Sequence, residues 1–287
     1  MIRLALILLA ASVGAAAHSA GGADEALAGP PSRVVTLAPH LAELVFAAGA
    51  GERLAAVTAY TDYPPAAAAL PRIGDAFRVD MERIAVIDPD LVLAWDGGTP
   101  EALTDRLRGL GYTVMVVRTR SVADVAAAIR RIGERLGTAA TAERAAARFL
   151  QELEAAVSGH ADARPLRVFY QVASRPLYTV NGGHYISELI RLCGGHNVFS
   201  DLNELAPVVT VESVLSRDPE VILAPAGEAG VLERWRAWQS LAAVRAGNLR
   251  TVPPDTLARP SPRLVQGAAD ICAAIRESRR GLPAAAP

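Results

Sequence analysis

The sequence predicts an α/β fold of two Rossmann-like lobes, each with a central parallel sheet, joined by a single long helix. Short apolar runs alternate with helical patterns along both halves of the chain, which is typical of parallel sheets flanked by helices. The phrase DPDLVLAW at 88–95 returns as DPEVILAP at 218–225. Between the halves, residues 121–159 are rich in Ala, Leu and paired charges, a composition that favours helix.

The first half reads as a regular alternation of strands and helices. The run RVVTLAP is apolar and ends at a proline, which predicts a buried strand, and a glycine ends the helical pattern that follows it. A proline-rich loop is expected over 61–77. We expect strands at 33–39, 52–60, 89–95 and 112–117, and helices at 40–51, 80–87 and 100–111.

The second half repeats this order, and its helix phrase SELIRLCGG matches AELVFAAGAG of the first half. Two like halves indicate two lobes built on one plan. We expect strands at 167–172, 219–225 and 248–254, and helices at 185–195, 209–217 and 234–244.

The helical stretch between the halves breaks near Gly137 and Thr138, and Thr141 is a candidate cap for the longer second helix. A rigid helix between two lobes permits only modest rocking. The predicted organisation is a signal peptide at 1–20, a first lobe at 32–135, a connecting helix at 136–162 and a second lobe at 163–280.

The first 20 residues predict export. One Arg precedes an apolar run of about 12 residues, and small residues then fit a cleavage site ending at Ala17 or Ala20, as in a secretory signal peptide. The expected location is the periplasm. A net charge of −1 gives no electrostatic reason to expect nucleic acid or an anionic membrane surface, and we expect a monomer.

Only two cysteines occur, Cys193 and Cys272. In an oxidising compartment an even pair indicates one disulfide, which here would tie the second half to its own C-terminal helix. Two buried thiols are the alternative.

Candidate ligand contacts follow the strands, because parallel sheets place their ligand-facing loops at the carboxyl ends of the strands. Two facing lobes would form a cleft between two such rims. Tyr60 and Trp95 end strands of the first lobe, and glycines after Trp95 would let a flat ring approach a ligand. Alternatively, Trp95 caps the core of its own lobe.

The second lobe offers Tyr178 at the end of a strand and His184 where a helix begins. His40 stands at the matching place in the first lobe, so the two histidines could contact one ligand from opposite sides; the alternative is capping or surface histidines. Arg259 lies between helix breakers and has a forked donor suited to carbonyls or carboxylates. It could instead pair with Asp255.

Catalytic motifs are missing from the sequence. No G-x-S-x-G, H-E-x-x-H, P-loop or dinucleotide fingerprint occurs, and no His, Cys and Asp group has metal-ligand spacing. We therefore expect a binding protein without a cofactor rather than an enzyme. An exported enzyme that uses His184 and Asp255 is the alternative from another class.

Several phrases together resemble one family. TLAPHLAEL, YTDYPPAA, ERIAVIDPDLVLAW, LCGGHNVF and ARPSPRLVQGAADIC resemble the periplasmic cobalamin-binding proteins of ABC-type vitamin uptake. They also resemble the wider group of helical-backbone binding proteins for haem and ferric siderophores. The resemblance runs from about Arg33 to Ile275, and the two-lobed fold of that family agrees with the repeat described above.

The resemblance implies a ligand set. Tyr60 and Trp95 match aromatic residues that line the corrin site, Tyr178 falls where the family has a phenylalanine, and Asp255 and Arg259 match polar contacts. Cys193 and Cys272 match a disulfide pair. Phe77 lies in a region where the family carries a tryptophan that this chain lacks, and we expect it to contact the ligand. The implied cargo is cobalamin or a related corrinoid.

The resemblance also explains the repeated phrase. Glu82 and Glu212, each six residues before a repeated Asp-Pro, match carboxylates that dock onto the two equivalent basic sockets of a dimeric ABC permease. The alternative is a pair of acids favoured at helix N-termini. Because the chain has fewer stacking rings than the family pattern and two rim histidines, a haem or ferric siderophore is the alternative ligand. His40 or His184 would then be a candidate axial ligand.

Overall fold

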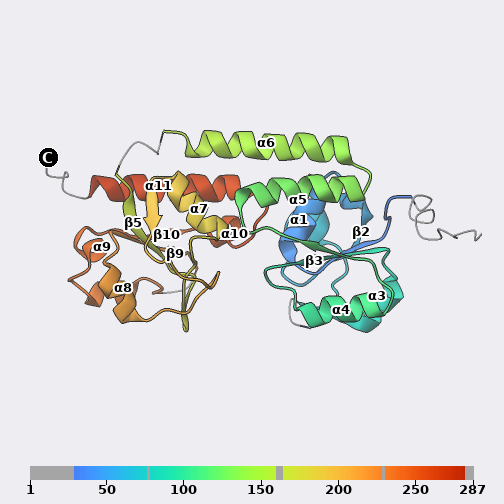
Figure 1. Cartoon of the computed structure of the whole chain (residues 1–287), viewed down its shortest axis with the longest axis horizontal. Helices are drawn as coiled ribbons and strands as arrows, with labels where there is room; N and C mark the ends of the chain where they lie inside the picture. Colours follow the sequence, from blue (N-terminus) through green and yellow to red (C-terminus); the bar gives the residue numbers. More distant parts are fainter. Residues whose placement is uncertain (1–28, 76–77, 160–163, 228–229, 282–287) are drawn as a thin grey trace, which may run out of the picture. The chain divides into compact units, whose positions relative to one another are not determined.

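The computed structural model describes residues 29–75, 78–159, 164–227 and 230–281. From Pro31 onward the described residues belong to one compact unit, which holds two four-stranded parallel sheets (Figure 1). This confirms the predicted α/β class with two parallel sheets. No helix within these ranges is long and apolar enough to cross a membrane.

The first sheet has the order β2-β1-β3-β4, with all neighbours parallel. Its strands are β1 (Val34–Thr36), β2 (Leu54–Ala56), β3 (Leu91–Trp95) and β4 (Val114–Val117). The helices of this lobe are α1 (Pro39–Ala47), α2 (Pro65–Ala68), α3 (Met81–Ile87) and α4 (Glu101–Gly109), with a 3₁₀ turn η1 (Gly51–Arg53). Ile84 of α3 and Leu107 of α4 share a hydrophobic cluster with one face of the sheet, whereas α1 packs in a different cluster.

The second sheet has the order β10-β9-β5-β8. Its strands are β5 (Leu166–Tyr170), β8 (Gly195–Asn197), β9 (Val221–Pro225) and β10 (Leu249–Val252), and β6 (Ala173–Ser174) and β7 (Leu177–Tyr178) form an antiparallel hairpin. The helices are α7 (Tyr185–Leu192), α8 (Val211–Arg217), α9 (Ala242–Arg245), α10 (Pro254–Leu257) and α11 (Leu264–Arg280), with a 3₁₀ turn η2 (Glu233–Ala237).

One predicted helix is wrong. Residues 234–244 form η2 and the short α9 with a break between them, not a continuous helix. Trp235 is fully buried and its indole N–H donates to Gln171 Oε1 at 2.8 Å, while Asp218 Oδ1 accepts from the first N–H of α9 at 2.8 Å. These two anchors from elsewhere in the lobe override the local helical preference.

The repeated phrase has the same local structure in both lobes. Asp80 and Thr210 cap α3 and α8 by accepting backbone N–H groups, and each helix ends at an Asp in the left-handed conformation, with φ of 47° at Asp88 and 40° at Asp218. A proline then leads into the strand. In each lobe the phrase thus forms the end of a short helix and the start of the inner strand that follows it.

The helical stretch between the lobes is split, as expected, near Gly137. It forms α5 (Val122–Arg135) and α6 (Ala139–Val157), and Thr138 rather than Thr141 occupies the N-cap of α6. Helix α6 packs against both α5 and α11 (Figure 1). One hydrophobic cluster contains Leu44 of the first lobe, Phe149 of α6 and Leu189 of the second lobe, so the two lobes share a continuous core on this side.

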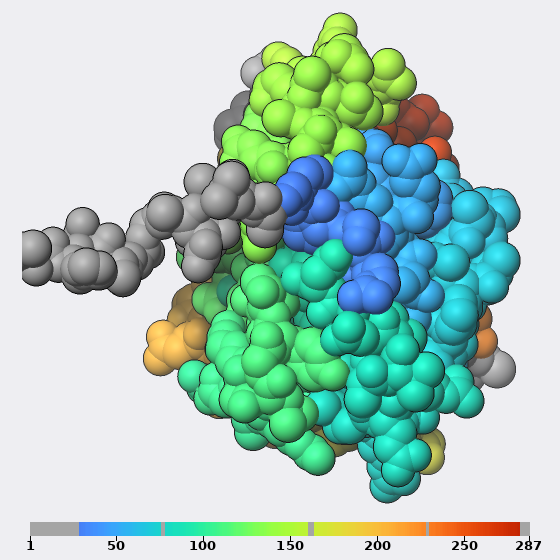
Figure 2. Space-filling view, turned by 90° about the vertical axis from the view of Figure 1, so that its right-hand side faces the viewer, coloured from blue at the N-terminus to red at the C-terminus, as the bar shows by residue number. Residues whose placement is uncertain are grey.

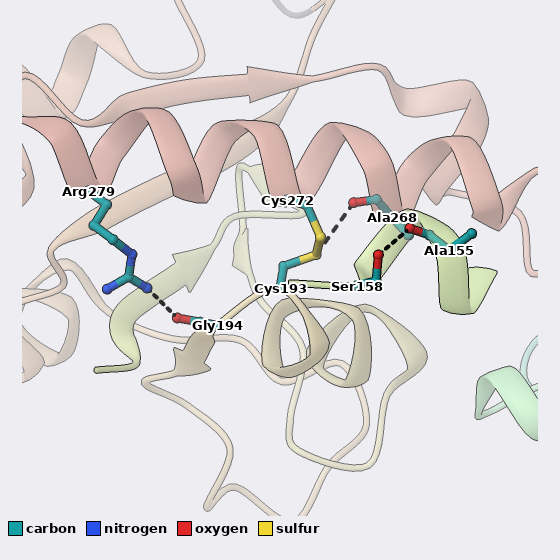
Figure 3. The surroundings of a disulfide bond; sticks show 7 residues. All are labelled: Ala155, Ser158, Cys193, Gly194, Ala268, Cys272 and Arg279. Carbon is teal, nitrogen blue, oxygen red and sulfur yellow. Dashed lines mark hydrogen bonds between the residues drawn. A yellow bond between two sulfur atoms is a disulfide. The ribbon is translucent and has the colours of Figure 1, made fainter. Parts of the chain in front are cut away.

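The predicted disulfide between Cys193 and Cys272 is confirmed. It joins the end of α7 to the middle of α11, with the two Cα atoms 4.7 Å apart (Figure 3). Arg279 of α11 adds a hydrogen bond to the carbonyl of Gly194 at 3.1 Å. The C-terminal helix is therefore fixed to the second lobe by a covalent and a polar contact.

Candidate functional site

Trp95 ends β3 at the carboxyl edge of the first sheet and is half-buried. The glycines after it lie against its ring, because a Cβ at Gly97 or Gly98 would come within 2.7 Å or 2.5 Å of the indole. We expected these glycines to leave the ring open to a ligand. Instead they allow the loop to pack against the indole, which keeps part of its surface exposed.

His40 lies in the interior, against the expectation of a rim contact. Only 3 % of it is exposed, its ring packs edge-on against Trp95 with centroids 4.9 Å apart, and its Nε2 has no hydrogen-bond partner among the described residues. Burial, together with the nearby charge of Arg259, lowers the pKa of His40 to about 3. His40 is thus a neutral support beneath Trp95.

His184 is not equivalent to His40. It caps α7, with Nδ1 accepting from the Ile186 N–H at 3.1 Å, and it remains half-buried. Burial lowers the pKa of His184 to about 4. No group of three or more His, Cys, Asp or Glu side chains within the described ranges is arranged to hold a metal ion.

Tyr60 stands out on the surface of the first lobe. It is 80 % exposed and has a φ of 63°, a conformation that side-chain-bearing residues rarely adopt. Its carbonyl accepts a hydrogen bond from Arg259 Nη2 at 2.9 Å. An arginine of the loop between α10 and α11 thus holds the backbone of an exposed aromatic residue in the other lobe.

The carboxylate partner of Arg259 is Asp62, not Asp255. Both Nη groups of Arg259 donate to Asp62, one of them at 3.1 Å, and this pairing lowers the pKa of Asp62. Asp255 lies exposed in α10, and no ion pair joins it to Arg259 within the described part of the chain.

A buried carboxylate, Glu43 of α1, completes this contact between the lobes. It is 4 % exposed; its Oε2 accepts from Ser261 Oγ at 2.6 Å, and its Oε1 lies 3.6 Å from Nη1 of both Arg259 and Arg263. Burial raises the pKa of Glu43. Sequence analysis missed Glu43, although its place in the first helix after β1, four residues beyond Pro39, could have marked it as close to the sheet edge.

The remaining predicted contacts are more dispersed. Tyr178 is half-buried on the β6–β7 hairpin and bridges to Val208. Phe77 lies outside the described residues. The structure therefore brings Tyr60, His40, Trp95 and Arg259 near one edge. Asp255 acts on Arg259 only through its charge, and among the described residues no hydrogen bond, ion pair or ring contact joins Tyr178 or His184 to these four.

Three cavities are lined by residues of the elements described above. One of about 950 Å³ is lined by the hairpin, the start of α8 and Arg234. Another of about 350 Å³ contains residues from both lobes, including Arg120, which follows β4, and His184. A third of about 370 Å³ lies between α1 and the Arg263 loop and includes Tyr63.

Glu82 and Glu212 each occupy the second position of their helix, in α3 and α8. Both side chains are exposed, and neither forms an ion pair with another described residue. Hydrogen bonds from its own backbone N–H and from Thr210 lower the pKa of Glu212. Figure 2 shows the segments of α3 and α4 on the opposite side of the first lobe from α6.

Comparisons with known proteins agree with this architecture. Residues 34–256 match the model of the periplasmic binding protein family. A vitamin B12-binding protein of Vibrio cholerae serotype O1 is 34 % identical over 88 % of this chain and 91 % of its own. One of Pectobacterium atrosepticum is 35 % identical over 86 % and 89 %.

Among solved structures, the periplasmic vitamin B12 binding protein of Vibrio cholerae has a TM-score of 0.80 at 34 % identity, covering 88 % of this chain and 100 % of its own. A periplasmic haem-binding protein from Pseudomonas aeruginosa has a TM-score of 0.74 at 22 % identity, covering 85 % and 92 %, which shows a shared fold. The chain belongs to the periplasmic binding protein family.

Proposed function

We propose that the chain is a periplasmic substrate-binding protein that captures cobalamin or a related corrinoid and delivers it to an ABC permease. The observation that carries the proposal is Tyr60, an exposed ring on a backbone of positive φ that Arg259 braces from the other lobe. Strained backbone and exposed aromatic surface both have a cost, and both are typical of ligand contacts. The names of the most similar relatives support the choice of ligand.

The corrin would lie with its faces against aromatic rings. Tyr60, Trp95, Tyr178 and Phe77 are the proposed apolar contacts, and stacked rings of this kind add about 0.5–1.5 kcal/mol each beyond the area they bury. Arg259 and Asp255 would hydrogen-bond the amide side chains of the corrin. Because Asp62 already holds Arg259 through both Nη groups, the guanidinium would offer the ligand its remaining donors in a fixed orientation.

The two histidines favour a corrinoid over haem. An axial ligand to haem iron needs an accessible nitrogen with a free lone pair. His40 is buried, and because His184 Nδ1 accepts a backbone N–H, the proton of its neutral ring lies on Nε2. The corrinoid would be cargo rather than a cofactor, and we propose no enzymatic role. Residues 1–20 would direct export, and the mature chain, with lobes at 32–135 and 163–280 around a connecting helix at 136–162, would act as a monomer.

Delivery would depend on Glu82 and Glu212. One exposed glutamate at the start of a matched helix in each lobe would suit a permease dimer with two equivalent basic sockets. The N-terminus of each helix also favours an acid, but that effect does not require both glutamates to lie free of ion pairs.

Absorption spectroscopy tests the ligand. The purified mature protein is incubated separately with cyanocobalamin and with haem, passed through a desalting column and scanned. We expect a corrinoid spectrum to co-elute at about one equivalent and haem to be left behind. Retention of haem with loss of the corrinoid would refute the proposal.

A further inference from the structure

A cavity of about 350 Å³, lined mostly by polar residues, lies where the lobes meet. Arg120, which follows β4, contributes from the first lobe. His184, Glu188 and Arg191 contribute from one face of α7, and His196 contributes from β8. The lining therefore brings two guanidinium groups and two imidazoles from both lobes around one space.

The single carboxylate of this lining is already engaged. Glu188 Oε2 accepts the backbone N–H of Val122 at 2.9 Å, the first residue of α5. Within the described ranges, the side chain of Arg191 has no hydrogen bond or ion pair, and the side chain of Arg120 uses only Nε, in a salt bridge to Asp96 Oδ2 at 3.2 Å. The Nη groups of both arginines are thus left for a ligand.

Resting on the function proposed above, we propose that this cavity binds the phosphodiester in the nucleotide tail of the corrinoid. That phosphodiester is the anionic group of a cobalamin, and a guanidinium fork matches its two free oxygens. Asp96 directly follows Trp95, so its salt bridge to Arg120 links the ring that stacks on the corrin to the side that holds the tail. The segment Trp95–Asp96 would then be linked to both the corrin ring and the nucleotide tail.

The experiment compares two ligands and two variants. Cyanocobalamin and cobinamide, a corrinoid without the nucleotide tail, are titrated calorimetrically into the wild type, Arg191→Gln and Arg148→Gln. Arg148 is a matched control because it is an exposed arginine of α6 whose side chain forms no ion pair or hydrogen bond with another described residue. We expect Arg191→Gln to weaken cyanocobalamin binding about tenfold or more, to leave cobinamide binding unchanged, and to differ from Arg148→Gln.

Inorganic phosphate separates a tail subsite from a site for free anions. Excess phosphate should weaken cyanocobalamin binding to the wild type and spare cobinamide binding. Equal weakening of both ligands by phosphate, or by Arg191→Gln, would overturn the tail assignment, as would unchanged cyanocobalamin binding in Arg191→Gln. In these cases corrinoid binding itself would stand, whereas a wild type that binds neither corrinoid would refute the proposed function together with this subsite.

Discussion

Trp95 occupies an intermediate position between core and surface. Its ring rests on His40 and on two glycines, yet part of it stays exposed at the end of β3. The indole caps its own lobe, and the part that stays exposed is available for the ligand contact proposed above. The glycines after it are required by the packing of the loop on the ring.

Replacing Trp95 tests whether that exposed part binds the ligand. We expect Trp95→Ala to weaken cyanocobalamin binding about tenfold or more, since the loss of one stacked ring and its buried area exceeds about 1.4 kcal/mol. Trp238→Ala is the matched control, because Trp238 is 40 % exposed and follows η2 in the second lobe. Calorimetry that gives the same affinity for wild type and Trp95→Ala would remove Trp95 from the site.

His40 predicts a pH dependence of stability. Its pKa is about 3 in the folded chain and near 6.5 when unfolded, so below pH 6.5 the unfolded state binds a proton that the folded state does not. The free energy of unfolding should therefore fall by about 1.4 kcal/mol for each unit by which the pH drops below about 6.5, until His40 itself protonates near pH 3.

Urea unfolding at several pH values between pH 6 and pH 4 gives the slope of the unfolding free energy against pH, which measures this effect. His40→Leu should lose its share of the slope, whereas His196→Leu, a change at an exposed histidine, should keep it. An unchanged slope in His40→Leu would show that His40 is not the buried neutral group described here.

The sequence identified single residues better than their partners. Tyr60, Trp95 and Arg259 follow strand ends or helix breakers, which are local signals. Asp62 and Glu43 act on Arg259 across 197 residues and more of the chain, and a local pattern carries no information about such a pair. Within the described residues Arg259 forms ion pairs with Asp62 and Glu43 and not with Asp255, the alternative partner four residues away.

At the scale of elements, α3 and α8 are the strongest sign of a two-fold design. They share a capped start, an exposed second-position glutamate and a left-handed Asp end. We expect Glu82→Ala combined with Glu212→Ala to abolish uptake while leaving ligand affinity unchanged, because neither glutamate lines any of the cavities described above. Transport into vesicles or cells that depend on this protein measures uptake, and calorimetry measures affinity.

Two other exposed glutamates provide the control. Glu134 of α5 and Glu154 of α6 form no ion pair with another residue of the described segments, so Glu134→Ala with Glu154→Ala removes the same charge from other helices. Normal uptake by the Glu82 and Glu212 double variant would contradict the docking role.

Helices and strands with a strong hydrophobic periodicity or a buried apolar run were predicted well. Strands β3 and β9 lie inside the predicted runs, because central parallel strands are apolar on both faces. Strand β8, with the sequence Gly-His-Asn, was missed because it carries no apolar run and forms only by pairing with β5. The predicted helix over 234–244 failed for the same kind of reason, since side chains elsewhere in the lobe fix its conformation.

At the scale of the whole molecule, the two lobes are joined both by a shared core and by a polar contact. The core runs from α1 through α6 to α7, and Glu43, Asp62 and Arg259 link the rims. Closely packed interiors resist deformation. A large closure of the two lobes around a ligand would disrupt both the shared core and the polar contact.

Small-angle X-ray scattering tests this stiffness. We expect the radius of gyration of the mature protein to stay the same, within error, when cyanocobalamin is added at saturation. A clear decrease would mean that the lobes hinge, and the rigid connection inferred from α6 would be wrong.

We propose that this chain holds one corrinoid between its two lobes. A calorimetric titration of the purified mature wild type with cyanocobalamin measures the affinity and the number of corrinoids bound. We expect a single saturable transition at one corrinoid per chain. A titration without saturable heat at any temperature tried, confirmed by equilibrium dialysis that retains no corrinoid, would contradict it.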